Sequence, residues 1–238
     1  MSLVKSIHKW LSVLIGLQLL IWLGTGLFFN LMDHTKARGN EYRINAEQSA
    51  YIDHTRLLEP RELVKKEPQP IHSIKLVSLL GQPYYLLNHS KGLYEHFYNK
   101  HSLVNAYTGN VKIIDETMAT ALASSSYSGE AEIRSSVKVA PFETDFPRER
   151  NKLWQVDFAD ELNTSVYIDA SSGRLVGHSN DDKRFADFFF MLHFMDYGSV
   201  GGFNNWQIIF FALLTLLFCI TGFIWTVNLL VKGRYKLS

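Results

Sequence analysis

The sequence predicts a membrane protein of the α+β class, with one transmembrane helix near each end of the chain and a folded domain between them. Two apolar blocks without charged side chains, at residues 10–32 and 206–231, predict the helices. Between the blocks, helical periodicity gives way to short runs of β-branched and aromatic residues separated by glycine-containing turns. This change of pattern predicts strands combined with a few helices in the central region.

The composition of the 238-residue chain excludes several classes of protein. Its 24 basic and 23 acidic side chains give a formal net charge of +1, so we expect no nucleic-acid partner. The single cysteine, Cys219, lies inside the second apolar block. One thiol cannot form a disulfide framework, a cysteine-rich zinc site or a C-x-x-C redox pair.

Both apolar blocks are long enough to cross a lipid bilayer, which takes about 20 predominantly apolar residues as a helix. The hydrocarbon core offers no water to backbone groups, so each block must satisfy its own hydrogen bonds as a helix. We predict transmembrane helices over residues 10–32 and 204–231, with short tails at residues 1–9 and 232–238. The first block is longer than the apolar part of a secretory signal and lacks a cleavage site, which predicts an uncleaved anchor.

The charges beside the two spans predict their orientation. Lys5 and Lys9 precede the first span, and residues 232–238 carry three more basic side chains. Short basic tails favour the cytoplasmic side, whereas long loops are exported whatever their charge. We therefore expect both termini in the cytoplasm and residues 33–183 on the outer side.

The central region is expected to combine strands with two helices. Residues 116–125 are mostly good helix formers with an acidic start, and residues 184–197 are expected to form an aromatic-rich interfacial helix. The predicted strands lie at residues 74–80, 83–88, 101–107, 111–115, 154–158, 165–169 and 174–177.

Two segments of the central region resemble each other. Residues 103–111 and 167–175 each run as a strand into an Asn-Ala or Asp-Ala pair, turn through a glycine and resume as a strand. The glycine supplies the positive φ that a tight turn requires. Two interpretations stay open: any two hairpins look alike, or the region contains two copies of a small α+β unit.

Several short motifs, in this order and spacing, resemble the PepSY-associated transmembrane family. In the first span, His8-Lys9-Trp10-Leu11 and Thr25-Gly26-Leu27 resemble the family pattern H-[KR]-W-L…T-G-L. The chain continues with VYIDASSGRLV, LHFMDYG and NNW, and Thr221-Gly222 follows in the second span. Residues 40–100 match only by position.

In size and layout the chain resembles the VciB-type members, which are two-span ferric-iron reductases of the bacterial inner membrane that feed ferrous-iron transporters. This resemblance implies two transmembrane helices that flank an exported, periplasmic PepSY-like α+β domain. It also implies an oxidoreductase that takes ferric iron as its substrate and supports ferrous-iron uptake.

His8 is the first candidate cofactor ligand. Ser12 and Gly16 follow it at intervals of four residues, so their small side chains leave room beside the imidazole for a partner helix or a flat macrocycle. The plain alternative is an interfacial histidine beside Lys9 and Trp10. The resemblance implies a haem ligand, since larger PepSY membrane reductases use histidines at such edges.

His193, in the helix predicted over residues 184–197, is the second candidate. Aromatic side chains and Asp196 lie three or four positions away, on the same helix face. A carboxylate bonded to one ring nitrogen would fix the tautomer and make the other nitrogen a better ligand. The alternative is an aromatic helix on the outer leaflet with a solvated histidine.

His34, just beyond the first span, is the third candidate. A helix from His8 to His34 rises about 39 Å at about 1.5 Å per residue, so these two cannot bind the same metal. A two-fold homodimer would instead pair His8 with His8 and His193 with His193 of the second copy. We therefore expect haem b, ligated through its iron by His8 and His193 and possible at His34, between the subunits of a homodimer.

The sequence names neither a catalytic residue nor an electron donor. It has no G-x-G-x-x-G after a strand, and the tails are too short for a flavin or nicotinamide domain. Quinone or a membrane reductase is therefore the expected donor. No C-x-x-C-H motif exists, so covalent c-type haem is excluded.

The remaining polar clusters have plain explanations. Among the other histidines, His89, His96 and His101 invite interpretation as a metal site, but their spacing matches no metal-ligand pattern and favours solvated loops. The central region also contains His54, His72 and His178. Asp157, Asp160 and Glu161 form either a solvated turn or an acidic patch that holds Fe³⁺ briefly.

A second class of function stays open. The chain could be a PepSY binding or regulatory module without a redox cofactor, which regulates a protease or serves as an accessory subunit of a membrane complex. This alternative does not depend on His8 or His193, whereas the redox hypothesis needs both.

Overall fold

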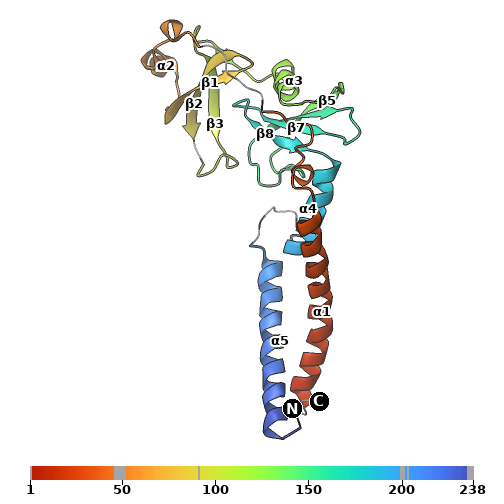
Figure 1. Ribbon diagram of the computed structural model, residues 1–238. Coiled ribbons are helices and arrows are strands. Elements are labelled where there is room, and N and C mark those ends of the chain that lie inside the picture. Colours follow the sequence, from red (N-terminus) through yellow and green to blue (C-terminus); the bar gives the residue numbers. More distant parts are fainter. Residues whose placement is uncertain (1, 46–51, 91, 199–201, 203, 235–238) are drawn as a thin grey trace. The chain divides into compact units, whose positions relative to one another are not determined.

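The computed structural model describes the whole chain except residues 1, 46–51, 91, 199–201, 203 and 235–238 (Figure 1). The last part of the predicted tail at residues 232–238 therefore lies outside the described residues. The chain divides into two compact units. The membrane unit comprises Met1–Met32 and Asp187–Ser238, and the sheet unit comprises Asp33–Ala186.

Two long apolar helices, α1 (Ser2–Leu31) and α5 (Trp206–Val231), dominate the membrane unit. Both are long and apolar enough to cross a membrane, as the predicted fold class requires. α1 begins at Ser2 rather than at residue 10, because no glycine or proline interrupts the residues before the apolar block. α5 begins at Trp206 because the side chain of Asn205 accepts a hydrogen bond from the Ile208 amide at 2.9 Å.

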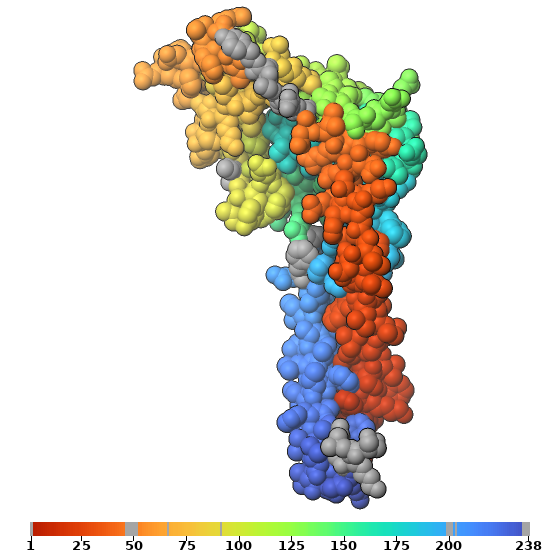
Figure 2. All heavy atoms as spheres, viewed as in Figure 1, coloured from red at the N-terminus to blue at the C-terminus, as the bar shows by residue number. Residues whose placement is uncertain are grey.

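The two helices run antiparallel and pack against each other (Figures 1 and 2). Side chains of α1 at the contact recur at alternating spacings of three and four residues, the pattern of a helix–helix seam. They are His8, Leu11, Ile15, Gln18, Trp22 and Thr25. At the centre of this seam Ile15 is 1% exposed and packs near Phe211 of α5.

The faces of α1 and α5 that point away from the seam carry exposed apolar side chains. In a soluble protein so large an apolar surface would favour aggregation, whereas in a bilayer it contacts lipid. The exposed residues include Leu17, Leu20, Leu23 and Leu27 of α1 and Leu213, Leu216, Ile220 and Phe223 of α5.

A shorter helix, α4 (Asp181–Phe194), corresponds to the aromatic helix predicted over residues 184–197. It begins earlier because the side chain of Asn180 accepts a hydrogen bond from the Lys183 amide at 2.9 Å. It ends at Phe194 because Met195 has a left-handed φ of 52°.

The last part of α4 packs on α1 through aromatic rings. Phe189 stacks on Phe28 with ring centroids 3.9 Å apart, and Phe190 stacks on Phe29 at 4.5 Å. These contacts hold the helix segment that carries His193 against the membrane-spanning α1.

The sheet unit contains two successive sets of one helix and four antiparallel strands. The first set is α2 (Pro60–Lys66), β1 (Ser73–Leu79), β2 (Gln82–Ser90), β3 (Lys100–Asn105) and β4 (Val111–Lys112). The second set is α3 (Glu116–Ser125), β5 (Ile133–Val139), β6 (Leu153–Phe158), β7 (Ser165–Asp169) and β8 (Leu175–Ser179). Each sheet has its strands in chain order, β1-β2-β3-β4 and β5-β6-β7-β8. Two short 3₁₀ turns, Lys36–Arg38 and His54–Arg56, precede the first set.

The turns after β3 and β7 have the same hydrogen-bond pattern. The side chain of Asn105 accepts from two backbone amides of its turn at 2.9 and 3.0 Å, and that of Asp169 accepts from two amides at 2.9 Å. Gly109 and Gly173 end these turns with φ of 75° and 72°, which disfavours any side chain.

A second correspondence lies far from those turns. The Tyr85 hydroxyl of β2 donates to the carbonyl of Leu58, two residues before α2, at 2.8 Å. The Trp154 indole of β6 donates to the carbonyl of Ile114, two residues before α3, at 3.0 Å. Chance similarity of two hairpins does not account for a matching helix-to-sheet bond, so the structure favours two copies of an α+β unit.

Each helix covers one face of its own sheet. Leu63 of α2 packs in a small core with side chains of β2 and β3. α3 packs in the larger core against β6 and β7, which also receives side chains from the other face of the first sheet. The larger core includes Leu79, Leu103, Met118, Leu122, Val156, Val166 and Ile168.

Two elements were not predicted. α2 buries a single leucine over about two turns, too little for a periodic signal. β5 is an edge strand with mainly exposed and half-buried side chains, so its sequence lacks the apolar alternation of a covered strand. β4 is shorter than the predicted strand at residues 111–115, because Asp115 caps α3 through the Met118 amide at 2.9 Å.

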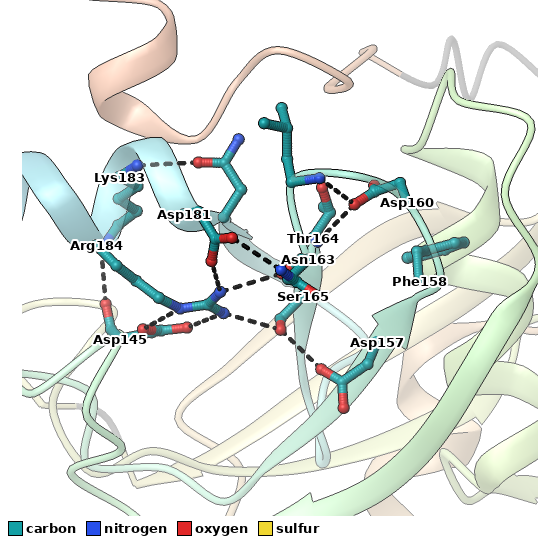
Figure 3. Close-up of polar contacts among 12 residues, drawn as sticks. Asp145, Asp157, Phe158, Asp160, Asn163, Thr164, Ser165, Asp181, Lys183 and Arg184 are labelled. Atoms are coloured by element: carbon teal, nitrogen blue, oxygen red, sulfur yellow. Dashed lines mark hydrogen bonds and ion pairs between the residues drawn. The ribbon is translucent and has the colours of Figure 1, made fainter.

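Arg184, in the first turns of α4, joins that helix to the second sheet (Figure 3). Its guanidinium donates to Asp145 at 2.9 and 3.2 Å, to the Ser165 hydroxyl at 3.1 Å and to the carbonyl of Asn163 at 3.1 Å. The Asp145 side chain is 10% exposed. Burial alone raises the pKa of Asp145, but the hydrogen bonds and charge of Arg184 outweigh it and hold that pKa below its usual value.

Replacement of Arg184 tests this attachment. Arg184→Gln removes the partner of a buried carboxylate, so we expect the free energy of unfolding of the sheet unit to fall by about 2–4 kcal/mol. Arg134→Gln is the matched control, since Arg134 is exposed and reaches the same Asn163 at 3.3 Å. We expect the control to cost less than about 1 kcal/mol. Equal losses in hydrogen-exchange protection of β7 for both variants would contradict this assignment.

His178 of β8 is a buried histidine, 1% exposed. The Ser126 hydroxyl donates to the carbonyl of Ala123, so its oxygen accepts from His178 Nε2 at 2.9 Å. Burial, assisted by the charge of Arg43, lowers the pKa of His178 to about 4. The folded protein therefore holds this imidazole neutral at any pH above that value.

The buried imidazole predicts a pH dependence of stability. Between about pH 6.5 and pH 4 the unfolded chain binds a proton at His178 that the folded chain excludes, so stability falls by about 3 kcal/mol as the pH is lowered. We expect His178→Gln to flatten this slope in hydrogen-exchange protection of β8, corrected for the intrinsic exchange rate. His72→Gln, at an exposed position, should leave the slope unchanged. A wild-type slope retained in His178→Gln would assign the effect to other groups.

Candidate functional site

His8 lies in the seam between α1 and α5, not free at the membrane surface. Its Nδ1 atom is 3.2 Å from the Thr221 hydroxyl, and its ring stacks on Phe218 at a centroid distance of 4.4 Å. The edge of the ring meets Trp225 at 5.6 Å. A Cβ atom on Gly222 would lie 2.8 Å from His8 Cε1, so the imidazole occupies the space that this glycine leaves.

His193, in α4, forms a similar contact with α1. Its Nδ1 atom is 2.7 Å from the Thr25 hydroxyl of α1, and its carbonyl accepts a hydrogen bond from the Trp22 indole at 2.8 Å. Phe29 and Phe194 meet the ring edge-on at 5.2 and 5.1 Å. The sequence predicted the carboxylate of Asp196 as the partner of this ring, whereas in the structure the Thr25 hydroxyl contacts its Nδ1 atom.

Each threonine fixes the tautomer of its histidine. The Thr221 hydroxyl donates to the carbonyl of Phe218 at 2.9 Å, and the Thr25 hydroxyl donates to the carbonyl of Ile21 at 2.7 Å. A hydroxyl has one proton, so when it donates to its own helix backbone its oxygen accepts from the imidazole and Nδ1 carries the hydrogen. The other ring nitrogen, Nε2, then keeps its lone pair and can ligate a metal.

The two imidazoles lie near opposite ends of α1. His8 and Thr25 are 17 positions apart in one helix, which corresponds to about 26 Å along its axis at about 1.5 Å per residue. Since His193 is hydrogen-bonded to Thr25, it cannot share a metal ion with His8. Each of the two positions thus has one histidine from this chain, and the role of His8 and His193 as ligands stays a prediction.

The chemistry of these nitrogens fits haem. A neutral imidazole whose Nδ1–H is held by an oxygen is the usual form of an axial histidine ligand. The residues that would hold haem are His8 and His193 as ligands, with Thr221 and Thr25 as positioning residues. Each site has one such histidine from this chain, so any second protein ligand would come from another molecule.

His34 does not share this arrangement. It follows α1 in the sheet unit, its side chain is exposed, and the neighbouring Asp33 accepts from the amides of Thr35 and Lys36. Among the described residues, no hydroxyl group forms a hydrogen bond with the His34 ring. The role of His34 as a ligand stays a prediction, and no contact like those of His8 and His193 supports it among the described residues.

Carboxylates and histidines of the sheet unit are used in protein contacts. Asp157 accepts from Ser135, Gln155 and Ser165, and Asp160 accepts from the Tyr127 hydroxyl and backbone amides. Within the described residues, no group of three or more His, Cys, Asp or Glu side chains could hold a metal ion. The described residues therefore offer no metal-binding group that would support the acidic patch suggested for Fe³⁺.

His89 differs from its expected place in a solvated loop. It is a buried side chain of β2, and both of its ring nitrogens have partners, the Pro70 carbonyl at 3.1 Å and the Ser102 hydroxyl at 2.9 Å. A histidine with both nitrogens engaged has no lone pair left for a metal. Its burial therefore serves the fold.

The Thr-Gly pairs of the family pattern are the sequence signal for the two threonines. Thr-Gly occurs once in each span, as Thr25-Gly26 and Thr221-Gly222. In an apolar helix a threonine can bond its own backbone and still accept from a neighbouring helix. Which histidine each threonine meets depends on the antiparallel packing of α1 and α5 and on α4, and the sequence alone does not give that.

Comparison with known proteins identifies the family. The model of the family described as "PepSY-associated TM region" matches residues 2–228, which is nearly the whole chain. No curated protein and no solved structure matches the chain in the corresponding searches. The match spans both membrane helices and the two sheets between them, so the chain is a membrane protein that belongs to the PepSY-associated transmembrane family.

Proposed function

We propose that this protein is a membrane redox protein in which His8 and His193 bind haem b, and that it reduces ferric iron in support of ferrous-iron uptake. The observation that supports the proposal is the pair of His–Thr hydrogen bonds, 3.2 Å at one end of the helix pair and 2.7 Å at the other. Two unrelated structural histidines would not need the same tautomer, whereas two ligands of the same cofactor would.

The chain's own residues orient and insulate the two ligands. Phe218 and Trp225 flank His8, and Phe29 and Phe194 flank His193, so both rings have apolar surroundings. When bound, haem b supplies reversible one-electron chemistry, which the protein tunes through ligand orientation and local polarity. The substrate is ferric iron, which gains one electron to become ferrous iron; the electron comes from the reduced form of a membrane quinone or from a membrane reductase.

A homodimer completes the proposed sites. Because each site offers one histidine, a second protein ligand to the same haem would come from another molecule. A two-fold axis parallel to the helices would bring each histidine close to its counterpart. The basic tails favour a cytoplasmic location for the His8 end, and we propose that residues 33–183 are periplasmic in a bacterial inner membrane.

The alternative function, a binding or regulatory module without a redox cofactor, makes a different prediction for the histidines. In that case the two His–Thr contacts serve only helix packing. The experiments below separate the two functions because they measure cofactor binding and folding in the same variants.

Replacement of each histidine tests the proposal. Protein purified in detergent from haem-replete cells should contain b-type haem, and His8→Ala and His193→Ala should each lose at least about half of it, because removing a ligand leaves one site without its axial nitrogen. His54→Ala, outside the membrane unit, is the control and should retain the wild-type haem content. Haem content is measured as the pyridine haemochrome per mole of chain, and circular dichroism checks the helices.

Absence of haem from the wild-type protein, or full haem in both histidine variants, would contradict the proposal. Folded but haem-free wild-type protein would favour the binding module.

Replacement of the threonines tests how the ligands are held. Thr25→Val and Thr221→Val keep the shape of the side chain but remove the acceptor for Nδ1–H, so haem affinity should fall by about 10–100-fold. Thr25→Ser and Thr221→Ser keep the hydroxyl and should restore most of it.

Thr215→Val is the matched control. Thr215 also lies in α5 and donates to the carbonyl of Phe211 at 2.9 Å, but among the described residues it contacts no histidine. Haem affinity that falls equally in Thr215→Val would mean that the threonines act through the helix backbone rather than through the imidazoles.

A further inference from the structure

A cavity of about 490 Å³ lies within the sheet unit, between the first sheet and the turn that joins β7 to β8. Its size is within the range of small-molecule sites in proteins. One wall is the face of β1–β3 that α2 does not cover, and the opposite wall is the β7–β8 turn. Residues that matter below are Lys75, Val77, Leu86, Asn88, His101 and Arg174.

Asn88, on the central strand β2, is the first sign that the cavity takes a ligand. The residue is 7% exposed, and its Oδ1 atom has no hydrogen-bond partner among the described residues. A buried amide oxygen without a partner loses its hydrogen bonds to water and gains none in return, so its retention calls for a reason. Ser73 of β1 and His101 of β3 lie directly opposite Asn88 in the two flanking strands.

His101 offers a second acceptor beside Asn88. The Ser171 hydroxyl donates to Asp169 at 2.7 Å, so its oxygen is left to accept from His101 Nδ1 at 3.4 Å. The remaining ring nitrogen, Nε2, therefore carries a lone pair. Burial lowers the pKa of His101 more than the nearby charge of Asp169 raises it, which keeps the ring neutral near pH 7.

The charged groups of the cavity are largely occupied. Arg174 pairs with Glu149 at 2.8 Å, and Asp169 accepts three hydrogen bonds within its own turn. The two remaining charged side chains of the lining, Lys75 and Glu95, are both exposed. The interior thus presents neutral acceptors rather than a free charge, which disfavours a small ion.

Four of the other lining residues are aliphatic, namely Val77, Leu79, Leu86 and Leu175, and they lie among the polar Ser73, Ser78, Asn99 and Ser172. Val77 of β1 and Leu86 of β2 lie on the same face of the first sheet as Asn88. Leu175 begins β8, directly after the facing turn. A ligand that fits must therefore combine N–H or O–H donors with an aliphatic group a few ångströms away. A polyol lacks the aliphatic group, and a fatty acid lacks the donors.

We propose that this cavity binds a short peptide segment, with a backbone N–H donated to Asn88 Oδ1 and an aliphatic side chain packed against Leu86. A peptide group supplies both a donor and an acceptor, which match the two ends of the Asn88 amide. The proposal is independent of haem and of iron.

The test uses the full chain in lipid nanodiscs and the capped tripeptide acetyl-Ala-Leu-Ala-amide as the probe. Calorimetry should detect saturable binding of one peptide per chain. Asn88→Leu should weaken binding at least tenfold and leave the unfolding temperature unchanged or higher, because leucine fills the site without an unpartnered oxygen. Asn110→Leu, at an exposed turn position, should bind as the wild type does.

Val77→Phe gives a second test if Asn88→Leu fails to fold. It fills the cavity from the edge strand and should also abolish binding. Sorbitol and octanoate serve as comparison probes. No saturable peptide binding to the wild type, equal binding in Asn88→Leu and Val77→Phe, or preferential binding of sorbitol or octanoate would each overturn the proposal.

A further arm identifies the source of the peptide, and each of its outcomes supports the proposal. Tighter binding of Ala-Leu-Ala with a free carboxylate would indicate a short peptide or a chain terminus, held in addition by Lys75. Equal or weaker binding than that of the capped form would indicate an internal segment of a partner protein.

Discussion

The hydrogen bond between an imidazole Nδ1–H and a threonine hydroxyl, made once near each end of α1, is the constraint on which the candidate site depends. Inside a bilayer no water is at hand to satisfy a polar side chain. Thr25 and Thr221 meet this condition in two ways at once, by donating to their own helix backbone and by accepting from a histidine. The result is a fixed tautomer that does not rely on a buried charge.

The helix seam makes these contacts possible. α1 presents His8 and Thr25 in the same row of seam positions as Ile15, so the packing that brings the two helices together also positions both polar contacts. Gly222 removes the side chain that would otherwise occupy the place of the His8 ring. The aromatic contacts between α4 and α1 serve the same purpose for His193.

The sequence predicted the class of the fold because its strongest signals are local. Charge-free apolar blocks and glycine turns need no knowledge of tertiary structure, and the similarity of residues 103–111 to 167–175 pointed to the repeat that the hydrogen bonds support. Partners across the chain were beyond local patterns. Asp196, one turn from His193, was the expected ligand partner, whereas Thr25 in another helix makes the contact. The edge strand β5 and the burial of His178 likewise depend on neighbours that are distant in sequence.

The tautomers of His8 and His193 are the most direct test of this account. Nitrogen-15 NMR of histidine-labelled, haem-free protein in liposomes distinguishes the Nδ1–H from the Nε2–H form, and His8→Asn and His193→Asn assign the signals. We predict that both imidazoles are neutral with the hydrogen on Nδ1, and that Thr25→Val and Thr221→Val each release only their own histidine from that form. An Nε2–H tautomer at either position in the wild-type protein would contradict the account, because that nitrogen could then not serve as a ligand.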